Sequence, residues 1–585
     1  MGEAMESEKK LFEAWREVAG KFPDVLSARL LHLNSISSSQ PVLTVRALHS
    51  QLDFDRNQRS KWVANYAVSK APQALLHRSP PVLSSELASA VSPDESQLAV
   101  LEKSARKKRC GSAKEPIPTE HIRIFDLKTG EGPRTLPLDV AEKHGKVHIH
   151  DEIGDLEWSS GGDRLLYIAE KKRESVGYSE SKFLDLKEAD AFKIGNEFLL
   201  RESWGEQLTE VTETMMVSVE VQSGTISLLD ENMPPAITPI LASWTPDDQG
   251  IVFVGLETSP SKLGKIYCFN RKSKLYHYDL ESKEVQQLSI PDEGSEGLAL
   301  SGVRWAPDGG SFVLLARKAG GSHGGAARLL HCDWKTKAIR CLVDIVECPE
   351  GVKGFPGIYA TSLPRRCWAS PSRILVHSLW GSRSDILAVS TETGQVNKVT
   401  DQGEDAGAWA VLDVAGGVIL ASASAPNSPP KLLAAALPTT PILSGLQWTQ
   451  LSHQSPVTTK LEEEICWTVT AFRRRALPEE VGAVDSTVET QPWSEQYEAI
   501  LVRPVKRLAP CPLLVLPHGG PHGHCTALWA PFTALLAKLG IASLKKDTFH
   551  FFWTAADVAA ATVTTASAAA RTVAHCCSPP SVPEV

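Results

Sequence analysis

Short β-type runs separated by turns dominate residues 40–455, where apolar residues almost never recur at helical spacing. In five places a polar turn, in most cases containing Pro-Asp or Gly-Gly, is followed by an apolar run that predicts a strand. These turns recur roughly 60 to 90 residues apart along the chain. They begin at Val91, Trp158, Trp244, Trp305 and Trp368.

A second element recurs between these turns and consists of a strand, a polar turn and another strand. Its five copies begin at Ile124, Val219, Tyr278, Cys332 and Val389. Two such hairpins in every repeat are typical of a β-propeller blade. Five blades are readable, residues 411–420 indicate a sixth, and we infer a seventh from residues 40–80. An array of two-sheet sandwiches is the alternative, which the repeat length disfavours.

The segments that flank this region have a different pattern. In residues 7–19, Leu11, Phe12, Trp15 and Val18 fall on one face of a predicted helix that ends at Gly20. We expect this helix to dock on another domain. Residues 425–460 are rich in Pro, Ser and Thr and indicate a domain boundary.

After this boundary the pattern predicts the start of a doubly wound α/β sheet. Strands are expected at 465–472, 498–502, 513–516 and 541–544, with a helix at 527–539. The strand at 513–516 is apolar throughout, which predicts burial on both faces. Beyond Leu544, Lys545, Lys546 and Asp547 interrupt the pattern, and an Ala/Thr-rich sequence follows that we expect to be disordered.

The candidate chemistry lies in the turn His518-Gly-Gly-Pro-His522, directly after the strand at 513–516. In α/β-hydrolases a His-Gly-Gly turn at this place offers a backbone N–H to a developing oxyanion. Glycine is needed there because the backbone must approach the substrate closely. An ordinary Gly-Pro turn is the alternative.

Composition narrows the possible functions of the chain. It is 42% hydrophobic and 22% charged, which is typical of a soluble globular protein, and its net charge of −8 argues against general nucleic-acid binding. No run of 18 apolar residues occurs, and the charged N-terminus lacks the apolar region of a signal peptide. The eleven scattered cysteines include no CxxC pair. We therefore expect a cytosolic protein with reduced thiols, no zinc site and no cofactor.

Several stretches together resemble the acylaminoacyl-peptidases, or acylamino-acid-releasing enzymes, of the prolyl oligopeptidase group. They are residues 165–173, 252–255, 274–280, 357–359, 367–368, 497–501 and 516–522. The resemblance implies a seven-bladed propeller that caps an α/β-hydrolase domain, packed with an N-terminal helix. It also implies a cytosolic, often oligomeric serine hydrolase that releases N-acyl amino acids from short acylated peptides.

On this resemblance the chain divides into a helical segment (1–24), a propeller (25–455), a partial hydrolase domain (456–544) and an atypical tail (545–585). The oxyanion loop of the family falls on five consecutive residues, namely His518, Gly519, Gly520, Pro521 and His522. The abrupt change of composition after Leu544 suggests a truncated isoform or an error in the gene model.

The catalytic triad has no counterpart in this reading. In the hydrolase fold, Ser, Asp and His follow the oxyanion strand in that order, and only about 60 residues follow it here. None of them matches a nucleophile elbow. We therefore expect no catalytic residues and an inactive chain from a family of enzymes, or alternatively a non-catalytic propeller that binds partners or forms a homo-oligomer.

Two further motifs could be mistaken for chemistry. Gly320-Gly-Ser322-His-Gly324 fits the G-x-S-x-G pattern, but it joins two predicted strands of one blade, so we expect a blade loop. His518, His522 and His524 lie close together in sequence and could suggest a metal site. Because no acidic partner accompanies them, a loop that faces the substrate is the favoured interpretation.

Overall fold

Residues of the chain that the computed structural model describes are 2–31, 42–69, 75–106, 117–138, 143–172, 198–205, 207–291, 294–347, 349, 354–400, 407–440, 443, 445–453, 456–473, 496–506, 510–518 and 523–546. They form seven β-sheets, accompanied by helices α1 (Gly2–Gly20), α3 (Pro456–Glu464) and α4 (Pro531–Lys538). None of these helices is both long enough and apolar enough to cross a bilayer.

The first three sheets are antiparallel meanders of consecutive strands. The first contains β1 (Asp24–Leu31), β2 (Val42–Asp53), β3 (Gln58–Ser69), β4 (Leu75–Arg78) and β5 (Val82–Leu83). The second contains β6 (Glu86–Val91), β7 (Gln97–Arg106), β8 (Ile117–Asp126) and β9 (Arg134–Pro137). The third contains β10 (Glu157–Trp158), β11 (Arg164–Glu170), β12 (Thr214–Glu220) and β13 (Ile226–Leu229).

Three further sheets continue this order along the chain. The fourth contains β14 (Ile237–Trp244), β15 (Gly250–Glu257), β16 (Ser273–Asp279) and β17 (Val285–Leu288). The fifth contains β18 (Leu298–Leu300), β19 (Arg304–Trp305), β20 (Ser311–Lys318), β21 (Arg328–Asp333) and β22 (Ile339–Val343). The sixth contains β23 (Trp368–Ser370), β24 (Arg373–Trp380), β25 (Arg383–Ser390), β26 (Val396–Lys398), β27 (Ala408–Ala415), β28 (Val418–Ala425), β29 (Ser428–Ala436) and β30 (Thr449–Gln450).

The recurring hairpins follow from local turn chemistry. In the turns after β8, β16 and β21, the side chain of an aspartate accepts hydrogen bonds from backbone N–H groups two or three residues ahead, so it closes the turn. These residues are Asp126, Asp279 and Asp333, and the same N–H donors lower the pKa of each carboxyl group. All ten predicted hairpins are antiparallel strand pairs in the structure.

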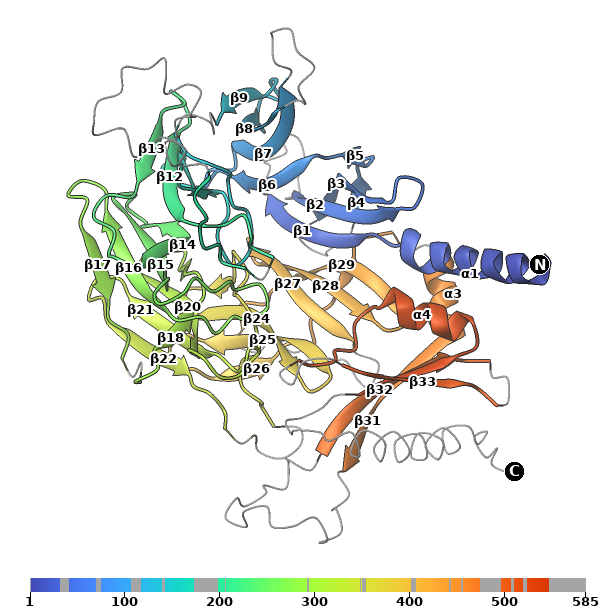
Figure 1. Cartoon of the computed structure of the whole chain (residues 1–585). Coiled ribbons are helices and arrows are strands. Elements are labelled where there is room, and N and C mark those ends of the chain that lie inside the picture. Colours follow the sequence, from blue (N-terminus) through green and yellow to red (C-terminus); the bar gives the residue numbers. More distant parts are fainter. Residues whose placement is uncertain are drawn as a thin grey trace, which may run out of the picture.

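The six sheets are arranged radially, as in a β-propeller (Figure 1). Buried apolar side chains fill the space between neighbouring sheets all the way around. The ring closes because residues of the first sheet, such as Leu30 and Val45, share one core with Leu420 and Leu432 of the sixth. Asp413 on β27 adds a polar link, since its Oδ2 accepts the N–H of Leu30 at 2.7 Å.

Part of the Pro-, Ser- and Thr-rich segment 425–460 belongs to the sixth sheet. Strands β29 and β30 lie inside that segment and complete the sheet that begins with β27. Pro429 and Pro430 are tolerated in β29, although proline cannot donate to a β-ladder. Helix α3, which begins at Pro456, follows within the same segment.

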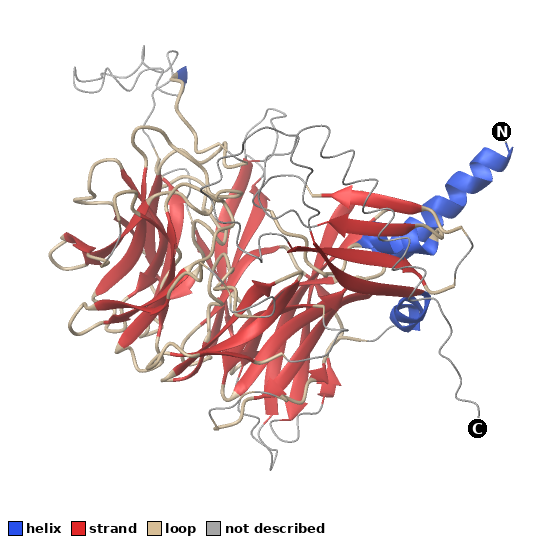
Figure 2. Cartoon of the chain, turned by 90° about the horizontal axis from the view of Figure 1, so that it is seen from below, coloured by secondary structure: helices blue, strands red, loops and turns tan. Residues whose placement is uncertain are grey.

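The seventh sheet has the order β31-β32-β34-β33, with β31 (Ile465–Arg473), β32 (Gln496–Pro504), β33 (Leu513–Pro517) and β34 (Ala542–Lys546). Helices α1, α3 and α4 gather beside it (Figure 2). Val18 of α1 packs with Leu461, Ile500 and Trp529 in one core, which confirms that the N-terminal helix docks on this part of the chain.

Two details of this region differ from the prediction. Helix α4 begins at Pro531 and not at 527, because the residue before a proline is disfavoured in the α conformation, and Ala530 is extended. Strand β34 continues through Lys545 and Lys546, since both backbones remain in the ladder with β33.

Candidate functional site

The candidate site lies at the carboxyl end of β33. Strands β33 and β34 are parallel, and α4 connects them, which forms a β-α-β unit. Pro517 is the last residue of β33 and pairs with Lys546, so His518 follows at the carboxyl edge of the sheet. In open α/β sheets this edge is where ligands bind.

Of the five residues predicted to form the oxyanion loop, the structure describes His518, which is half-buried. Gly519, Gly520, Pro521 and His522 lie outside the described residues. On the neighbouring strand β34, Lys545 pairs with Leu516 of β33. Burial lowers the pKa of the Lys545 ammonium group. The role of the loop therefore stays a prediction.

A loop of the propeller reaches the same sheet. Gly381 and Ser382 connect β24 to β25, and Glu498 of β32 accepts the N–H of Ser382 at 2.6 Å through Oε2. Ser382 O in turn accepts the N–H of Ala527 at 2.8 Å. The ring of His524 hydrogen-bonds to the carbonyl oxygen of Gly381. The propeller is thus fixed to the segment that follows the candidate loop.

Gly381 is needed in this contact for two reasons. Its φ of +59° lies in the left-handed region, and a Cβ atom there would stand 2.8 Å from Oε2 of Glu498. Neither Gly381 nor Glu498 stands out in the sequence as a candidate site residue. Gly381 carries a local turn signal, whereas the contact of Glu498 with the propeller depends on tertiary packing that no spacing in the sequence reveals.

Ser322 lies far from this edge in topology, as predicted. Its loop joins β20 to β21, which are neighbouring antiparallel strands of the fifth sheet. Asn270 holds the loop by accepting the N–H of Gly320 at 3.0 Å and by donating to the carbonyl oxygens of Gly320 and Gly321. A nucleophile elbow joins a strand to a helix, so this loop has the wrong connection for one.

The histidines of the candidate loop do not form a described metal site. His524 contacts Gly381 as stated above, and His522 lies outside the described residues. Within the described ranges, no group of three His, Cys, Asp or Glu side chains is arranged to hold a metal ion.

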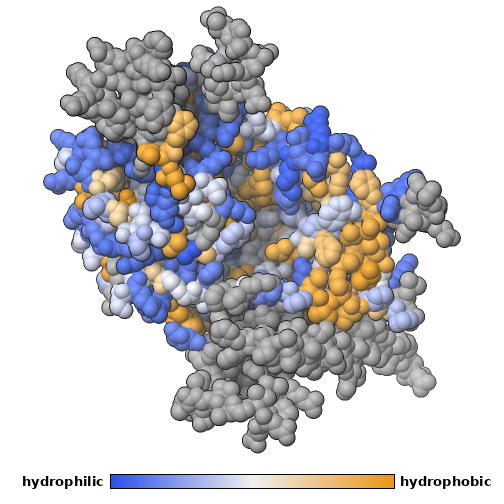
Figure 3. Space-filling model, in the orientation of Figure 1, coloured by the Kyte–Doolittle hydropathy of each residue, from blue (hydrophilic) through white to orange (hydrophobic). Residues whose placement is uncertain are grey.

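The strand that carries the candidate loop is less buried than its sequence predicted. β33 is the edge strand of the sheet, none of its residues is fully buried, and Leu514 is 39% exposed. Leu528 before α4, Phe532 on it and Leu539 directly after it are also exposed. Apolar side chains gather on this side of the molecule (Figure 3). The expected burial on both faces is therefore wrong for β33, which also lies at the edge of the sheet, with β34 as its one neighbour among the described strands.

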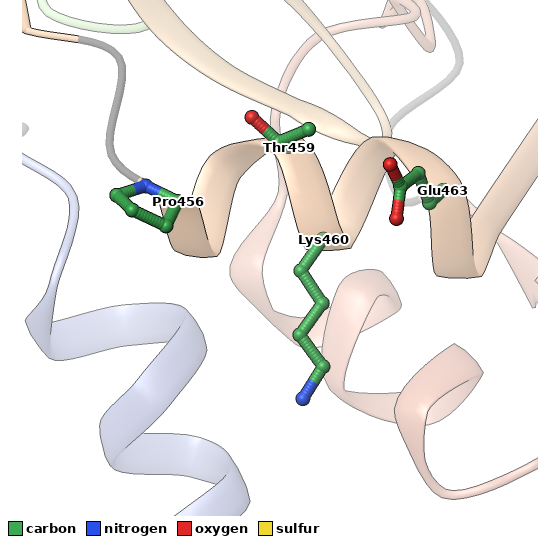
Figure 4. Close-up of a pocket in the computed structure, with 4 residues that line it drawn as sticks. All are labelled: Pro456, Thr459, Lys460 and Glu463. Carbon is green, nitrogen blue, oxygen red and sulfur yellow. The ribbon is translucent and has the colours of Figure 1, made fainter.

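A shallow depression of about 550 Å³ lies along α3, where Pro456, Thr459, Lys460 and Glu463 line it. Figure 4 shows Lys460 pointing to the opposite side of the helix from Thr459. Lys460 is 3.6 Å from Glu464 in an exposed i, i+4 ion pair. The four lining residues bring no acid–base pair of the kind that catalysis needs together.

Comparison with known proteins gives one consistent result. Residues 21–465 match the model of the N-terminal domain of acylamino-acid-releasing enzymes. The chain is 32% identical to the acylamino-acid-releasing enzyme of Mus musculus over 519 residues, which are 86% of this chain and 67% of that protein. The enzyme of Homo sapiens is 31% identical over 520 residues, with the same shares.

Solved structures agree with this result at the level of the fold. A Pyrococcus horikoshii acylaminoacyl peptidase superposes with a TM-score of 0.54 and 11% identity, over 90% of this chain and 65% of that one. An acylaminoacyl peptidase in complex with Z-Gly-Gly-Phe-chloromethyl ketone gives 0.55 and 11%, over 91% and 66%. The chain thus spans about two thirds of the length of the proteins that it matches.

Proposed function

Because the chain belongs to the acylamino-acid-releasing enzyme family, we propose that it is an acylaminoacyl-peptidase-type protein that carries the propeller and the oxyanion side of the hydrolase domain. We further propose that the chain as given does not complete the reaction by itself. In the family activity, a serine attacks the acyl-peptide bond, a histidine transfers the proton, and backbone N–H groups stabilise the oxyanion.

A seven-bladed propeller is the architecture that we assign to residues 24–450. The sixth sheet consists of two four-stranded halves, β23–β26 and β27–β30, which are joined by one parallel position, Ser384 with Ala408. Counting each half as a blade gives seven blades with the other five sheets. The closed core between the first sheet and β28 and β29 supports this assignment.

A partial α/β-hydrolase domain is the assignment for residues 456–546. The observation that carries the proposed function is the unit β33-α4-β34, with His518 at the carboxyl end of its first strand. This is the position of the oxyanion loop in that fold. By family analogy we propose short N-acylated peptides as substrates, a cytoplasmic location and a possible homo-oligomeric state.

The proposal of no turnover rests on the described residues after His518, in which no serine, aspartate and histidine follow one another in the order of the triad. Removing a catalytic triad costs on the order of 10⁶ in kcat, and what remains depends on an intact oxyanion hole and binding cleft. Ser322, which has the matching motif, lies in the loop between β20 and β21 of the propeller.

The test is hydrolysis of a chromogenic acetyl-alanine substrate by the purified full chain and by a Ser322→Ala variant, with the mouse relative as positive control. We expect no turnover in either form and no labelling by a fluorophosphonate that reacts with activated serines. Activity that is lost in Ser322→Ala would contradict the assignment of that loop. Activity in both forms, with a labelled serine identified by mass spectrometry, would contradict the proposal that the chain is inactive.

A further inference from the structure

A second cavity, of about 560 Å³, opens where the last blade of the propeller meets β31 and α3. Its walls come from the last blade, which includes β27 to β30 and Trp448 directly before β30, and from Glu462 of α3 and Trp467 of β31. The ribbons of β28, β29 and β31 mark this junction in Figure 1. A volume of this size lies within the range of sites for small ligands, and such sites are frequent between domains.

Three tryptophans form the apolar part of the cavity. The rings of Trp409 and Trp448 are 4.9 Å apart between centroids and tilted by 43°, so they open as a wedge. Trp467 of β31 contributes a third ring from the other side of the junction. The guanidinium of Arg383 lies over this ring, 5.8 Å from the centroid of Trp467. Tryptophan faces bind apolar and proline side chains by stacking, at little cost in conformational entropy.

The charges in the cavity neutralise each other. Nζ of Lys431 is 2.7 Å from Oε1 of Glu462, and Oγ of Ser428 donates to the same oxygen at 2.8 Å. Both members of the ion pair are less than one-third exposed. A charged ligand would have to break this pair or lose its own hydration without a partner, whereas an uncharged ligand would not.

Two side-chain amides line the cavity and suit the backbone of a peptide. Asn427 donates from Nδ2 to the carbonyl oxygen of Ile465 at 3.0 Å, and Gln450 donates from Nε2 to that of Ser452 at 3.1 Å. These bonds orient the amides, and each amide oxygen can accept from a peptide N–H. Together, aromatic walls, a neutral interior and oriented amides favour an extended chain with apolar side chains.

We propose that this cavity is a peptide-binding site for an extended, uncharged segment that carries an apolar, aromatic or proline side chain. Strand register separates it from the candidate oxyanion loop. Trp467 pairs with Val502, Val502 with Ser543, and Ser543 with Leu514, four residues before His518. With about 4.8 Å between strands and 3.3 Å per residue, Trp467 is on the order of 20 Å from His518. The site therefore binds peptide without the triad, and its existence does not depend on hydrolysis.

The experiment is isothermal titration of the full chain with the doubly blocked peptide acetyl-Ala-Pro-Phe-Ala-amide. Matched peptides carry Asp or Lys in place of Phe. Trp448→Ala and Trp467→Ala remove one wall each, and Ala423→Leu narrows the cavity while it leaves the three rings in place. Trp62→Ala, in the first sheet, is the control for the loss of a tryptophan elsewhere. The melting temperature of every variant shows whether it is folded.

We expect saturable binding of the Phe peptide, about five- to ten-fold weaker in Trp448→Ala and Trp467→Ala, since an aromatic contact contributes at this level. Ala423→Leu is expected to weaken binding similarly, and Trp62→Ala to leave it unchanged. The Asp and Lys peptides should bind at least ten-fold more weakly. No saturable binding by the wild-type chain, equal binding by folded Ala423→Leu and wild type, or equal affinity for the charged peptides would overturn the proposal.

Discussion

The carboxylate of Asp413 joins the two ends of the propeller, and its removal should open the ring. Besides the hydrogen bond from the N–H of Leu30, the carboxylate accepts two hydrogen bonds from the guanidinium of Arg366. Nε donates to Oδ1 at 2.7 Å, and Nη2 donates to Oδ2. Arg366 also donates to the carbonyl oxygen of Leu30 at 2.8 Å. Burial alone would lower the pKa of Arg366, but the hydrogen bond and charge of Asp413 raise it above its ordinary value. The three groups therefore form one closed network between β1 and β27.

The magnitude follows from what the substitution leaves behind. In Asp413→Ala, the guanidinium of Arg366 and the N–H of Leu30 stay in place without their acceptor. Breaking a buried ion pair from one side costs about 3–5 kcal/mol. We expect the lower end, about 3 kcal/mol, because the side chain of Arg366 is 28% exposed. For a cooperative unit of about 430 residues, this corresponds to a fall in Tm of roughly 3 °C.

The assay is differential scanning calorimetry of the full chain, with hydrogen exchange of β1 as the local readout. Asp55→Ala is the matched control, because its partner Arg16 and Asp55 itself are 53% and 81% exposed, and such pairs contribute little. The double variant Asp413→Ala with Arg366→Met should be more stable than Asp413→Ala alone, since no unpaired charge remains. A Tm within 1 °C of wild type, together with unchanged exchange of β1, would refute the role of Asp413 in closure.

Two other predictions concern buried charge and the exposed edge. Burial raises the pKa of Glu157 to about 7 from an ordinary 4.5, so the folded chain keeps the proton to a higher pH than the unfolded chain. The free energy of unfolding should therefore fall as pH rises from about 4.5 to 7. Glu157→Gln should flatten the dependence of Tm on pH over this range. Parallel plots of Tm against pH for the wild type and the variant would contradict this prediction. Leu514→Lys should reduce aggregation, measured by light scattering, without lowering Tm, because a charge on an edge strand blocks further pairing. Leu544→Lys, at a position 1% exposed in the same sheet, should instead lower Tm by several degrees, and equal effects of the two substitutions would argue against β33 as the exposed edge.

The hairpins could be predicted from the sequence because the information for each lies within about ten residues. Asp279, for example, closes its turn on N–H groups two and three residues ahead, so residue type and spacing are sufficient. The start of the β-α-β unit was predictable for the same reason. The beginning of α4 was not predicted correctly, because apolar spacing outweighed the local effect of Pro531 on Ala530.

Features that depend on contacts between distant segments could not be predicted. Asp413 and Leu30 are 383 residues apart, and Glu498 meets Ser382 across 116 residues. The tryptophan-lined cavity is of the same kind, since Trp409, Trp448 and Trp467 read in sequence as three ordinary core residues. The repeat pattern of the sequence predicts the length of each blade, but it does not predict which blade contacts which part of the seventh sheet.

The candidate loop and the tryptophan-lined cavity differ in how they depend on the rest of the chain. The loop that begins at His518 lies on an edge strand with one described neighbour, so its geometry relies on whatever completes or covers that edge. The cavity between the last blade and β31 relies on the closed ring and on α3, whose Leu461 is fully buried. Loss of ring closure in Asp413→Ala should therefore weaken peptide binding at the cavity. The same substitution should leave the surroundings of His518 unchanged, because Asp413 and the network that it completes are confined to the propeller.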